Sequence, residues 1–317
     1  MVEVAAALAN WNGAAHVDRC LDCLGAQTYP VRHIAVVDNG STDGSRERIA
    51  ARFPAVRLLA NARNEGYAAG YNQAIAAAGG DAVLILNTDV FLEPDFVERV
   101  LAGLERHPGA AAVTGRLYEQ ATGRLISGGF YLRRQIRIQP APLAEEDLEV
   151  FGVTGAAALF RRDALEDLKV DGQCFDEAYF AYGEDIDLAW RARLLGWSAW
   201  SVPDARGEHV GSGSLGGRLR FLDKPASFQR HTLKNRYLTV MKNATPGMAL
   251  RLAPVLVASE LLLWPYLLLT RTRSFPALVR APIDALRLLG RARRWRAQIQ
   301  GRRHPGAARI PRFVRGL

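Results

Sequence analysis

The feature that most constrains the fold is the alternation of apolar and helical stretches over the first hundred residues. Short apolar runs occupy Val2 to Ala9, Ile34 to Val37, Val56 to Leu59 and Val83 to Leu86. Helical stretches lie between them at His16 to Gln27, Ser45 to Arg52 and Tyr67 to Ala78. Strands that are apolar throughout belong to sheets covered on both faces, and strand–helix alternation favours parallel pairing. The sequence therefore predicts an α/β fold with a mainly parallel sheet and helices on both faces.

Polar side chains follow each of these apolar runs. The clusters are Asn10 to Gly13, Asp38 to Asp43, Asn61 to Gly66 and Asn87 to Asp89. Asn, Asp, Gly and Ser favour turns and helix caps, so one such cluster alone is ordinary turn chemistry. In an open parallel sheet, however, ligands bind beyond the carboxyl ends of the strands. Four polar clusters on one rim therefore indicate a ligand-binding edge.

Asn87-Thr88-Asp89 places a carboxylate at the end of the fourth apolar run. Hard divalent cations such as Mg²⁺ and Mn²⁺ take oxygen ligands and leave positions open for phosphate oxygens, so one or two protein carboxylates can hold a metal-bound diphosphate. Helix capping is the alternative, because Thr88 or Asp89 could precede a helix that starts near Pro94. Spacing alone leaves both interpretations open.

A second acidic group, formed by Glu184, Asp185 and Asp187, opens a predicted helix that ends at Gly196. Acidic residues in a first turn offset the helix dipole, which is the structural interpretation. These acids also repel one another and follow an aromatic-rich segment, Phe175 to Tyr182. A general base in a pocket rimmed by aromatic rings accounts for both features.

The middle of the chain is less regular. A hairpin is predicted near Gly128-Gly129, followed by a basic patch of Arg133, Arg134 and Arg137. Regular patterns return with a strand over Val153 to Phe160 and a helix over Arg162 to Leu168. The composition of Gly211 to Ser214 predicts a flexible or substrate-gated loop, after which the chain is helical.

Composition limits the class of protein. Hydrophobic residues make up 49% of the 317 residues, enough for a substantial core, and three cysteines do not form a disulfide framework. Cys20 and Cys23 share one face of a predicted helix, which indicates packing and not a redox or metal site. The N-terminus lacks a basic leader with an apolar run, so we expect the catalytic part to be cytoplasmic.

The C-terminal part is basic and apolar. The formal net charge of +9 includes a segment after Arg271 that is dense in arginine, which indicates an anionic partner. Leu250 to Thr270 is strongly apolar but contains Arg251 and Glu260, and Arg271 to Arg303 alternates arginine with apolar residues. We predict interfacial helices on the inner membrane surface. The alternatives are a membrane span and a solvated or oligomerising helix pair, and no motif supports nucleic acid binding.

Several motifs together resemble the family 2 glycosyltransferases with a GT-A fold, especially the bacterial rhamnosyltransferase-like branch. In chain order they are Val36 to Ser45, Asn64 to Asn72, Leu86 to Asp89, Gly155 to Ala157, and Tyr182 to Arg191 with Gly196-Trp197 beyond it. The resemblance covers roughly Val2 to Asn243. It implies a catalytic domain over residues 1–243, with a nucleotide-sugar half (1–108) and an acceptor half (109–243). Residues 244–317 form the helical appendage.

The resemblance also implies roles for individual residues. It makes Asp38 the contact to the nucleobase, with Asn10 and Trp11 nearby, and Asp185 the base that deprotonates the acceptor hydroxyl, beside Glu184. Asp89 and His209 are then ligands of Mg²⁺ or Mn²⁺. The remaining substrate-binding residues are Asn64, Gly66, Asn72, Asn87, Gly155 and Trp190. Asn87 departs from the aspartate expected at the first position of the metal motif, which leaves Asp89 as its only carboxylate.

These roles predict an inverting enzyme that moves a sugar, such as rhamnose from dTDP-rhamnose, from a nucleotide-diphosphate donor to a glycan or polyprenyl-linked acceptor in envelope polysaccharide synthesis. A UDP-hexose donor is an alternative. A nucleotidyltransferase would carry a basic, Gly-rich loop after the first strand, where this chain has Asn10 to Gly13. A non-catalytic nucleotide-sugar-binding scaffold is the remaining alternative, and Glu184-Asp185 argues against it. The sequence leaves the oligomeric state open.

Overall fold

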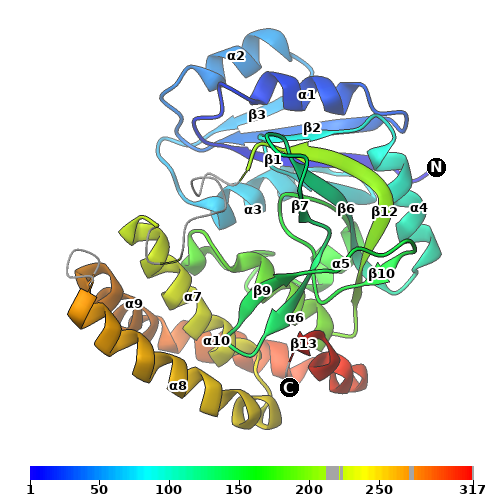
Figure 1. Ribbon diagram of the computed structural model, residues 1–317. Helices are drawn as coiled ribbons and strands as arrows, with labels where there is room; N and C mark the ends of the chain where they lie inside the picture. Colours follow the sequence, from blue (N-terminus) through cyan, green and yellow to red (C-terminus); the bar gives the residue numbers. More distant parts are fainter. Residues whose placement is uncertain (212–220, 222–223, 271–274, 316–317) are drawn as a thin grey trace.

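The computed structural model describes residues 1–317 except 212–220, 222–223, 271–274 and 316–317. A large mixed sheet runs through the molecule, with helices on both of its faces (Figure 1). Its strands follow the order β10-β12-β6-β11-β4-β1-β2-β3, with β5 and β7 paired to β12 and β6. A smaller sheet has the order β13-β8-β9. The predicted loop at Gly211 to Ser214 falls largely outside the described residues.

The strands of the large sheet are β1 (Val4–Asn10), β2 (Val31–Asp38), β3 (Arg57–Ala60), β4 (Ala82–Leu86), β5 (Val90–Leu92), β6 (Ala110–Glu119), β7 (Leu125–Ser127), β10 (Leu148–Glu149), β11 (Ala157–Arg161) and β12 (Ser198–His209). Those of the small sheet are β8 (Phe130–Arg133), β9 (Arg137–Pro140) and β13 (Val314–Arg315). The helices are α1 (Val17–Gly25), α2 (Ser45–Arg52), α3 (Tyr67–Ala78), α4 (Phe96–Arg106), α5 (Arg162–Asp167), α6 (Glu184–Leu194), α7 (Ala226–Asn243), α8 (Pro246–Thr270), α9 (Phe275–Arg287) and α10 (Leu289–Gly301), with short turns η1 (Glu177–Tyr179) and η3 (Pro305–Phe313).

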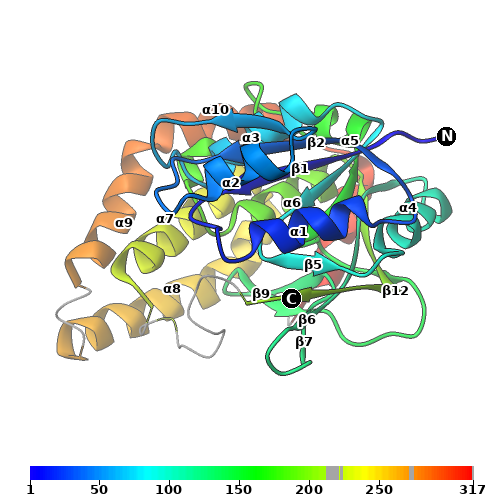
Figure 2. The same ribbon diagram turned by 90° about the horizontal axis from the view of Figure 1, so that it is seen from above.

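The N-terminal half confirms the predicted parallel arrangement. β1 pairs in parallel with β2 and β4, and β2 pairs in parallel with β3. Alternate residues of β1 enter two separate cores, because Ala5 and Ala7 pack beneath α3 while Val4 and Leu8 pack beneath α1. Viewed from above, α1 and α2 cover one face of the sheet (Figure 2). The two cores explain why these strands are apolar throughout.

Two local predictions were wrong or incomplete. Gly128-Gly129 does not form a hairpin turn, because β7 pairs with β6 whereas β8 pairs with β9 in the other sheet. The short strand β5 was not predicted, and it separates Asp89 from α4. Strand β5 pairs with β12, which is distant in the sequence, so local patterns do not predict it. Gly128-Gly129 instead lies between two local hairpins, β6–β7 and β8–β9.

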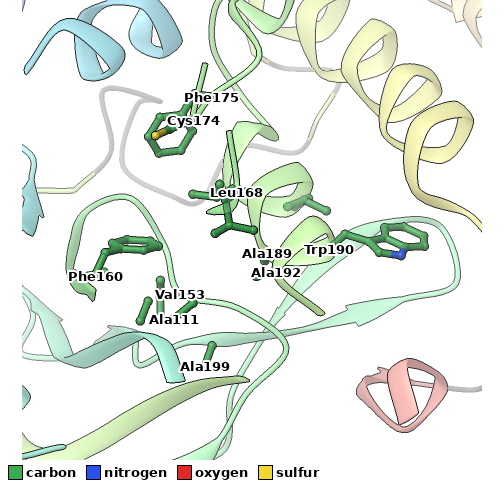
Figure 3. Packing of buried hydrophobic residues seen from close by; sticks show 14 of the residues in the cluster. Ala111, Val153, Phe160, Leu168, Cys174, Phe175, Ala189, Trp190, Ala192 and Ala199 are labelled. Atoms are coloured by element: carbon green, nitrogen blue, oxygen red, sulfur yellow. The ribbon is translucent and has the colours of Figure 1, made fainter. Parts of the chain in front are cut away.

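The helices α7 to α10 gather on one side of the sheet (Figure 1). Trp295 and Ile299 of α10 enter the same hydrophobic core as α3 and α6, together with Ile310 and Phe313 of η3. Figure 3 shows part of this core, where Phe175 and Ala189 lie near Leu168. The region beyond residue 243 therefore completes the main core. The domain boundary at that residue stays a prediction.

Cys20 and Cys23 both lie on α1, as predicted. Cys20 is fully buried, and its Sγ donates to the carbonyl of Asn87 at 3.6 Å. Burial raises the pKa of the Cys20 thiol. A neutral, buried thiol is a packing residue and a poor nucleophile.

Candidate active site

The ends of β1 and β2 are joined by a buried polar network. The Asn10 amide Nδ2 donates to Asp38 Oδ1 at 2.9 Å and to Ser45 Oγ at 2.8 Å. Asp38 Oδ2 accepts from the backbone N–H of Ser41 at 3.1 Å, and the Asp38 side chain is fully buried. These bonds hold the loop after β2 against the end of β1. The nucleobase contact of Asp38 stays a prediction, because its Oδ1 already binds Asn10 of β1 and its Oδ2 binds the loop after β2.

The loop before α3 is held in the same way. Asn39 Nδ2 donates to the Gly66 carbonyl at 2.9 Å, and Asn64 Oδ1 accepts from the Gly66 N–H at 2.8 Å. Gly66 has a φ of 93°, and a Cβ there would lie 2.6 Å from the Phe180 carbonyl oxygen. Only glycine allows this approach. The approach brings the start of α3 against the segment that precedes the acidic helix.

Asp89 and His209 meet at the rim of the sheet. β5 and β12 pair antiparallel, with His209 opposite Val90, and this places His209 Nε2 3.2 Å from Asp89 Oδ1. His209 is buried, and its Nε2 has no aligned hydrogen-bond partner. Asp89 does not cap α4, because Asp95 occupies that position. The capping interpretation is therefore wrong for Asp89.

The donor set of this pair fits a hard divalent cation. A carboxylate oxygen and an unpartnered, buried imidazole nitrogen at the same point are suitable ligands, and phosphate oxygens can supply the remaining positions. Among the residues that the structure describes, no group of three or more His, Cys, Asp or Glu side chains surrounds a common point. A metal held here would thus depend on its substrate for further ligands.

Two tyrosines of α3 connect this rim with the acidic helix. Tyr71 Oη donates to Asn87 Oδ1 at 2.8 Å, and its ring lies 4.2 Å from that of Tyr67. Tyr67 Oη donates to the Gly155 carbonyl at 3.0 Å. Burial raises the pKa of the Tyr67 hydroxyl, and the nearby charges of Glu184 and Asp185 raise it further. Asn87 is therefore fixed by Tyr71, and Gly155 by Tyr67.

Glu184 and Asp185 begin α6 in a desolvated environment. Burial raises the pKa of both carboxyl groups, and the charges of Asp185 and Asp187 raise that of Glu184 further. Glu184 Oε2 is buried without a hydrogen-bond partner, whereas Asp185 Oδ1 accepts from the Ile186 N–H at 2.8 Å. Asp185 is the less buried of the two. A carboxylate with a raised pKa is suited to accept a proton near neutral pH.

A strained turn positions this pair. Phe180 and Tyr182 have positive φ angles of 65° and 73°, and Gly183 follows with 92°. Asn235 of α7 donates from Nδ2 to the carbonyls of Tyr179, Ala181 and Tyr182 at 3.1, 2.8 and 2.6 Å. Non-glycine residues in this region cost about 1–3 kcal/mol each and persist only where the surroundings impose them. Asn235 supplies part of that constraint.

Asp187 has a structural role. Its Oδ1 lies 3.0 Å from Lys242 Nζ, and its Oδ2 lies 3.1 Å from Arg191 Nε. Although burial acts to raise it, Lys242 and Arg191 hold the pKa of Asp187 below its usual value. Lys242 also pairs with Asp176 at 2.7 Å. Of the predicted acidic group, only Glu184 and Asp185 are thus available for chemistry.

Comparison with known proteins agrees with this geometry. Residues 7–169, about half of the chain, match the model of glycosyl transferase family 2. The chain belongs to this family. It is 33% identical over 235 residues to N-acetylglucosaminyl-diphospho-decaprenol L-rhamnosyltransferase of Mycobacterium tuberculosis, covering 63% of this chain and 74% of that protein. The predicted family, its rhamnosyltransferase-like branch and the enzyme class are therefore confirmed.

Solved structures of other glycosyltransferases share the fold. S. aureus TarS in complex with UDP-GlcNAc superposes with a TM-score of 0.62 at 13% identity, covering 99% of this chain and 93% of that chain. The mannosyltransferase PcManGT from Pyrobaculum calidifontis, in complex with GDP-Man and Mn²⁺, gives a TM-score of 0.54 at 20% identity, with 98% and 87% coverage. At such identities the similarity shows the fold alone, and it confirms the predicted GT-A class.

Within this family 2 fold, two of the predicted substrate-binding residues have different surroundings from those expected. Trp190 belongs to the buried core drawn in Figure 3 and is fully buried. It packs edge-on against Phe151, which does not fit the predicted substrate contact. The Asn72 side chain is bound to the backbone of Phe175. Its Nδ2 donates to the Phe175 carbonyl at 2.8 Å, and its Oδ1 accepts from the Phe175 N–H at 2.9 Å. Trp11 is 58% exposed at the rim and stays a candidate.

Sequence patterns missed Asn235, Tyr67 and Tyr71 as functional residues. Asn235 lies in a helix with little amphipathic pattern, and its importance comes from three carbonyls distant in the sequence. Tyr67 and Tyr71 are four apart on one helix face, which is a signal of side-chain contact but not of role.

Proposed function

We propose that the protein transfers a sugar from a nucleoside-diphosphate donor to a hydroxyl group of a lipid-linked glycan, with inversion at the anomeric carbon. The observation that carries this proposal is the position of α3. Its Tyr71 binds Asn87 of the metal motif at 2.8 Å, and the Ala68 N–H in its first turn donates to the Phe180 carbonyl, in the turn before the Glu184–Asp185 pair, at 3.2 Å. A donor diphosphate at the first point and an acceptor hydroxyl at the second would be adjacent.

Asp185 is the base in this proposal. The attacking hydroxyl loses its proton to a carboxylate oxygen of Asp185 while the oxygen bonds to the anomeric carbon, and the nucleoside diphosphate leaves from the opposite side. One displacement of this kind inverts that carbon. Asp89 and His209 would hold Mg²⁺ or Mn²⁺, which supplies positive charge for the departing diphosphate. Glu184, buried and with the more strongly raised pKa, keeps a proton and limits repulsion of Asp185.

The relative's name suggests the substrates. The mycobacterial protein is named for transfer of L-rhamnose to an N-acetylglucosaminyl-diphospho-decaprenol. We therefore favour a nucleotide-rhamnose such as dTDP-rhamnose as the donor and a sugar-diphosphate lipid as the acceptor, in envelope polysaccharide synthesis. A UDP-hexose is the alternative donor, because the superposed S. aureus TarS structure contains UDP-GlcNAc.

An acceptor of this kind would place the enzyme on the inner face of the membrane. α8 is long and apolar enough to cross a bilayer, and 11% of its most apolar window is buried. Its outer surface carries exposed apolar side chains, among them Leu261 at 69%, Leu262 at 75% and Leu269 at 83%. Glu260, in the same helix, accepts from Tyr237 at 2.8 Å and pairs with Arg236, which attaches α8 to α7. A helix attached to α7 through a carboxylate in this way fits an interfacial position better than a span.

A ligand screen tests the proposal. The melting temperature of the full chain is measured with dTDP-rhamnose, UDP-GlcNAc and GDP-mannose, each with and without Mn²⁺. We expect one donor with Mn²⁺ to stabilise the protein by about 2.7 kcal/mol at a hundred times its Kd. Stabilisation by UDP-GlcNAc alone would replace rhamnose with a hexose donor. The proposal fails if no nucleotide sugar changes the melting temperature under either condition.

A further inference from the structure

A cavity of about 590 Å³ lies beside the acid pair. Its walls come from β9, the first turn of α6, α7 and α8, on the side of the molecule where the C-terminal helices gather (Figure 1). Glu184 and Asp185 line it, whereas Asn10 and Asp89 are not among the described residues around it. Its size is that of a small-molecule site. The cavity is therefore a second ligand space, separate from the donor rim and next to the base.

Three cations line this cavity, and neither of the two acids that line it, Glu184 and Asp185, forms an ion pair with a residue that the structure describes. Arg137, Lys224 and Arg236 all contribute to its walls. Arg236 pairs with Glu260, but among the residues that the structure describes no carboxylate pairs with Arg137 or Lys224. Lys224 instead places Nζ 4.5 Å from the ring centre of Phe228. A partly desolvated group of positive charges favours an anionic ligand.

Two buried polar atoms in the same wall lack partners. Thr232 Oγ1 and Arg236 Nε, one turn apart on α7, are buried without a hydrogen bond. Leaving such atoms unsatisfied costs about 1–3 kcal/mol each. Burial lowers the pKa of the Arg236 guanidinium, and the positive charge of Arg137 lowers it further. An anion with several acceptor oxygens would satisfy both donors and offset the repulsion between the two guanidinium groups.

The rest of the wall is apolar and continues onto the surface of α8. Phe221, Phe228 and Leu263 line the cavity. Leu263 belongs to α8, whose neighbouring Leu261 and Leu262 are exposed. A ligand that combines phosphate groups with a hydrocarbon chain matches this arrangement. Its phosphates would contact the cationic side chains, and its hydrocarbon chain would contact the apolar ones.

We infer that this cavity is the acceptor site and that it binds a lipid diphosphate, with Arg137, Lys224 and Arg236 around the phosphates. The hydrocarbon chain leaves along α8, and the sugar attached to the diphosphate extends toward Asp185. The reaction of that sugar rests on the proposed function. The binding of the lipid diphosphate does not, so the two can be tested separately.

The test uses the full chain with farnesyl diphosphate as the probe, in EDTA so that no metal-bound diphosphate forms at the donor rim. Dissociation constants are measured by calorimetry for farnesyl diphosphate, farnesol and inorganic pyrophosphate. We expect farnesyl diphosphate to bind at least about tenfold more tightly than either fragment, because charged hydrogen bonds and apolar contacts act together. The double variant Arg137→Gln/Lys224→Gln is expected to lose at least about tenfold in affinity.

Arg133→Gln is the matched control, because Arg133 is an exposed arginine on the same small sheet and does not line the cavity. It should bind the probe like the unmodified protein. Unchanged affinity in the double variant, or farnesol or pyrophosphate binding as tightly as farnesyl diphosphate, overturns the inference. Donor binding with Mn²⁺ verifies the fold of the variants. Failure of transfer with intact probe binding would instead overturn the proposed function.

Discussion

Glu184 and Asp185 are neighbours with different environments. Burial raises the pKa of each carboxyl group, but the negative charges of Asp185 and Asp187 raise the pKa of Glu184 further. As the pH falls, Glu184 therefore takes up its proton first, and Asp185 is still ionised when Glu184 is neutral. This difference supports the proposed role of base for Asp185 and a neutral role for Glu184.

Substitution of each acid by its amide separates these roles. Asp185→Asn should lower kcat by about 10²–10⁴-fold, because a general base contributes that much. Glu184→Gln should retain most activity, since the amide resembles the protonated acid. Both are measured by transfer from the donor found in the screen, with donor affinity as the control. Equal losses in the two variants would contradict the assignment.

The pH profile provides an independent check on the same pair. The base must be ionised, and its raised pKa moves the acid limb of kcat above the range of an ordinary carboxyl group, which titrates near pH 4. Activity is thus present above that limb and is lost as the pH falls through it. Glu184→Gln should keep the limb in place, because Glu184 is already protonated there. An acid limb near pH 4 in both proteins would show that Asp185 is not the base.

His209 is the second residue whose role can be tested alone. Its buried Nε2 beside Asp89 has no aligned partner in the protein. His209→Ala should raise the Mn²⁺ concentration for half-maximal activity by at least about tenfold. His107→Ala is the control, because His107 forms a similar pair with Asp147, at 2.9 Å, away from the rim. The same Mn²⁺ requirement in both variants would remove His209 from the metal site.

At this scale the sequence predicted individual residues better than their partners. The pairing of Asp89 with His209 was predicted through the family resemblance, and the structure brings them together. Asp187 belonged to the same acidic run as Asp185, yet Lys242 and Arg191 neutralise it. Those cations come from elsewhere in the fold or from the buried face of α6, so the run alone could not distinguish a structural acid from a catalytic one.

At the scale of elements, α7 holds the turn that precedes α6 through Asn235. The boundaries of α2 and α3 were predicted from the sequence, because their ends have local signals in Gly44, Gly66 and Gly79. The contact between α7 and the turn before α6 has no such signal, since residues 179–182 and Asn235 are far apart in the chain. Strand β5 was missed for the same reason. The periodicity of hydrophobic residues does not predict pairing between segments that are distant in the sequence.

Asn235→Ala tests the importance of this contact. Loss of the amide leaves the carbonyls of Tyr179, Ala181 and Tyr182 without their common donor. We expect a destabilisation of about 1–3 kcal/mol in urea unfolding and a larger proportional fall in kcat than in donor affinity.

Gln298→Ala is the comparison for Asn235→Ala. Gln298 Nε2 donates to Asp171 Oδ1 at 2.8 Å on the exposed surface, so its loss should change neither stability nor kcat appreciably. A variant at Asn235 that is destabilised but keeps full kcat would show that the contact stabilises the fold without positioning the base.

At the scale of the whole molecule, the C-terminal region both completes the core and presents an apolar surface. The basic composition beyond Arg271 predicted an anionic partner, but several of these arginines have partners within the protein. Arg291 Nε donates to Asp176 at 2.9 Å, and Arg296 donates to the carbonyl of Ala244 at 2.7 Å. Charge counts did not distinguish these from surface arginines. The apolar outer surface of α8 is therefore the better candidate for membrane contact.

Replacing Leu261, Leu262 and Leu269 of α8 together by serine should weaken binding to vesicles of anionic phospholipid. Burial of a leucine side chain contributes about 1.5–3 kcal/mol, so even partial insertion of three leucines makes at least a tenfold difference in the fraction that sediments with vesicles.

Leu143→Ser is the control, because Leu143 is 69% exposed but lies outside α8 and α9. Transfer to a water-soluble acceptor should be unchanged in the triple variant, because none of the three leucines lines the acceptor cavity. Equal sedimentation of the triple variant and the unmodified protein would show that α8 is not the membrane contact, and its exposed leucines would then require a protein partner.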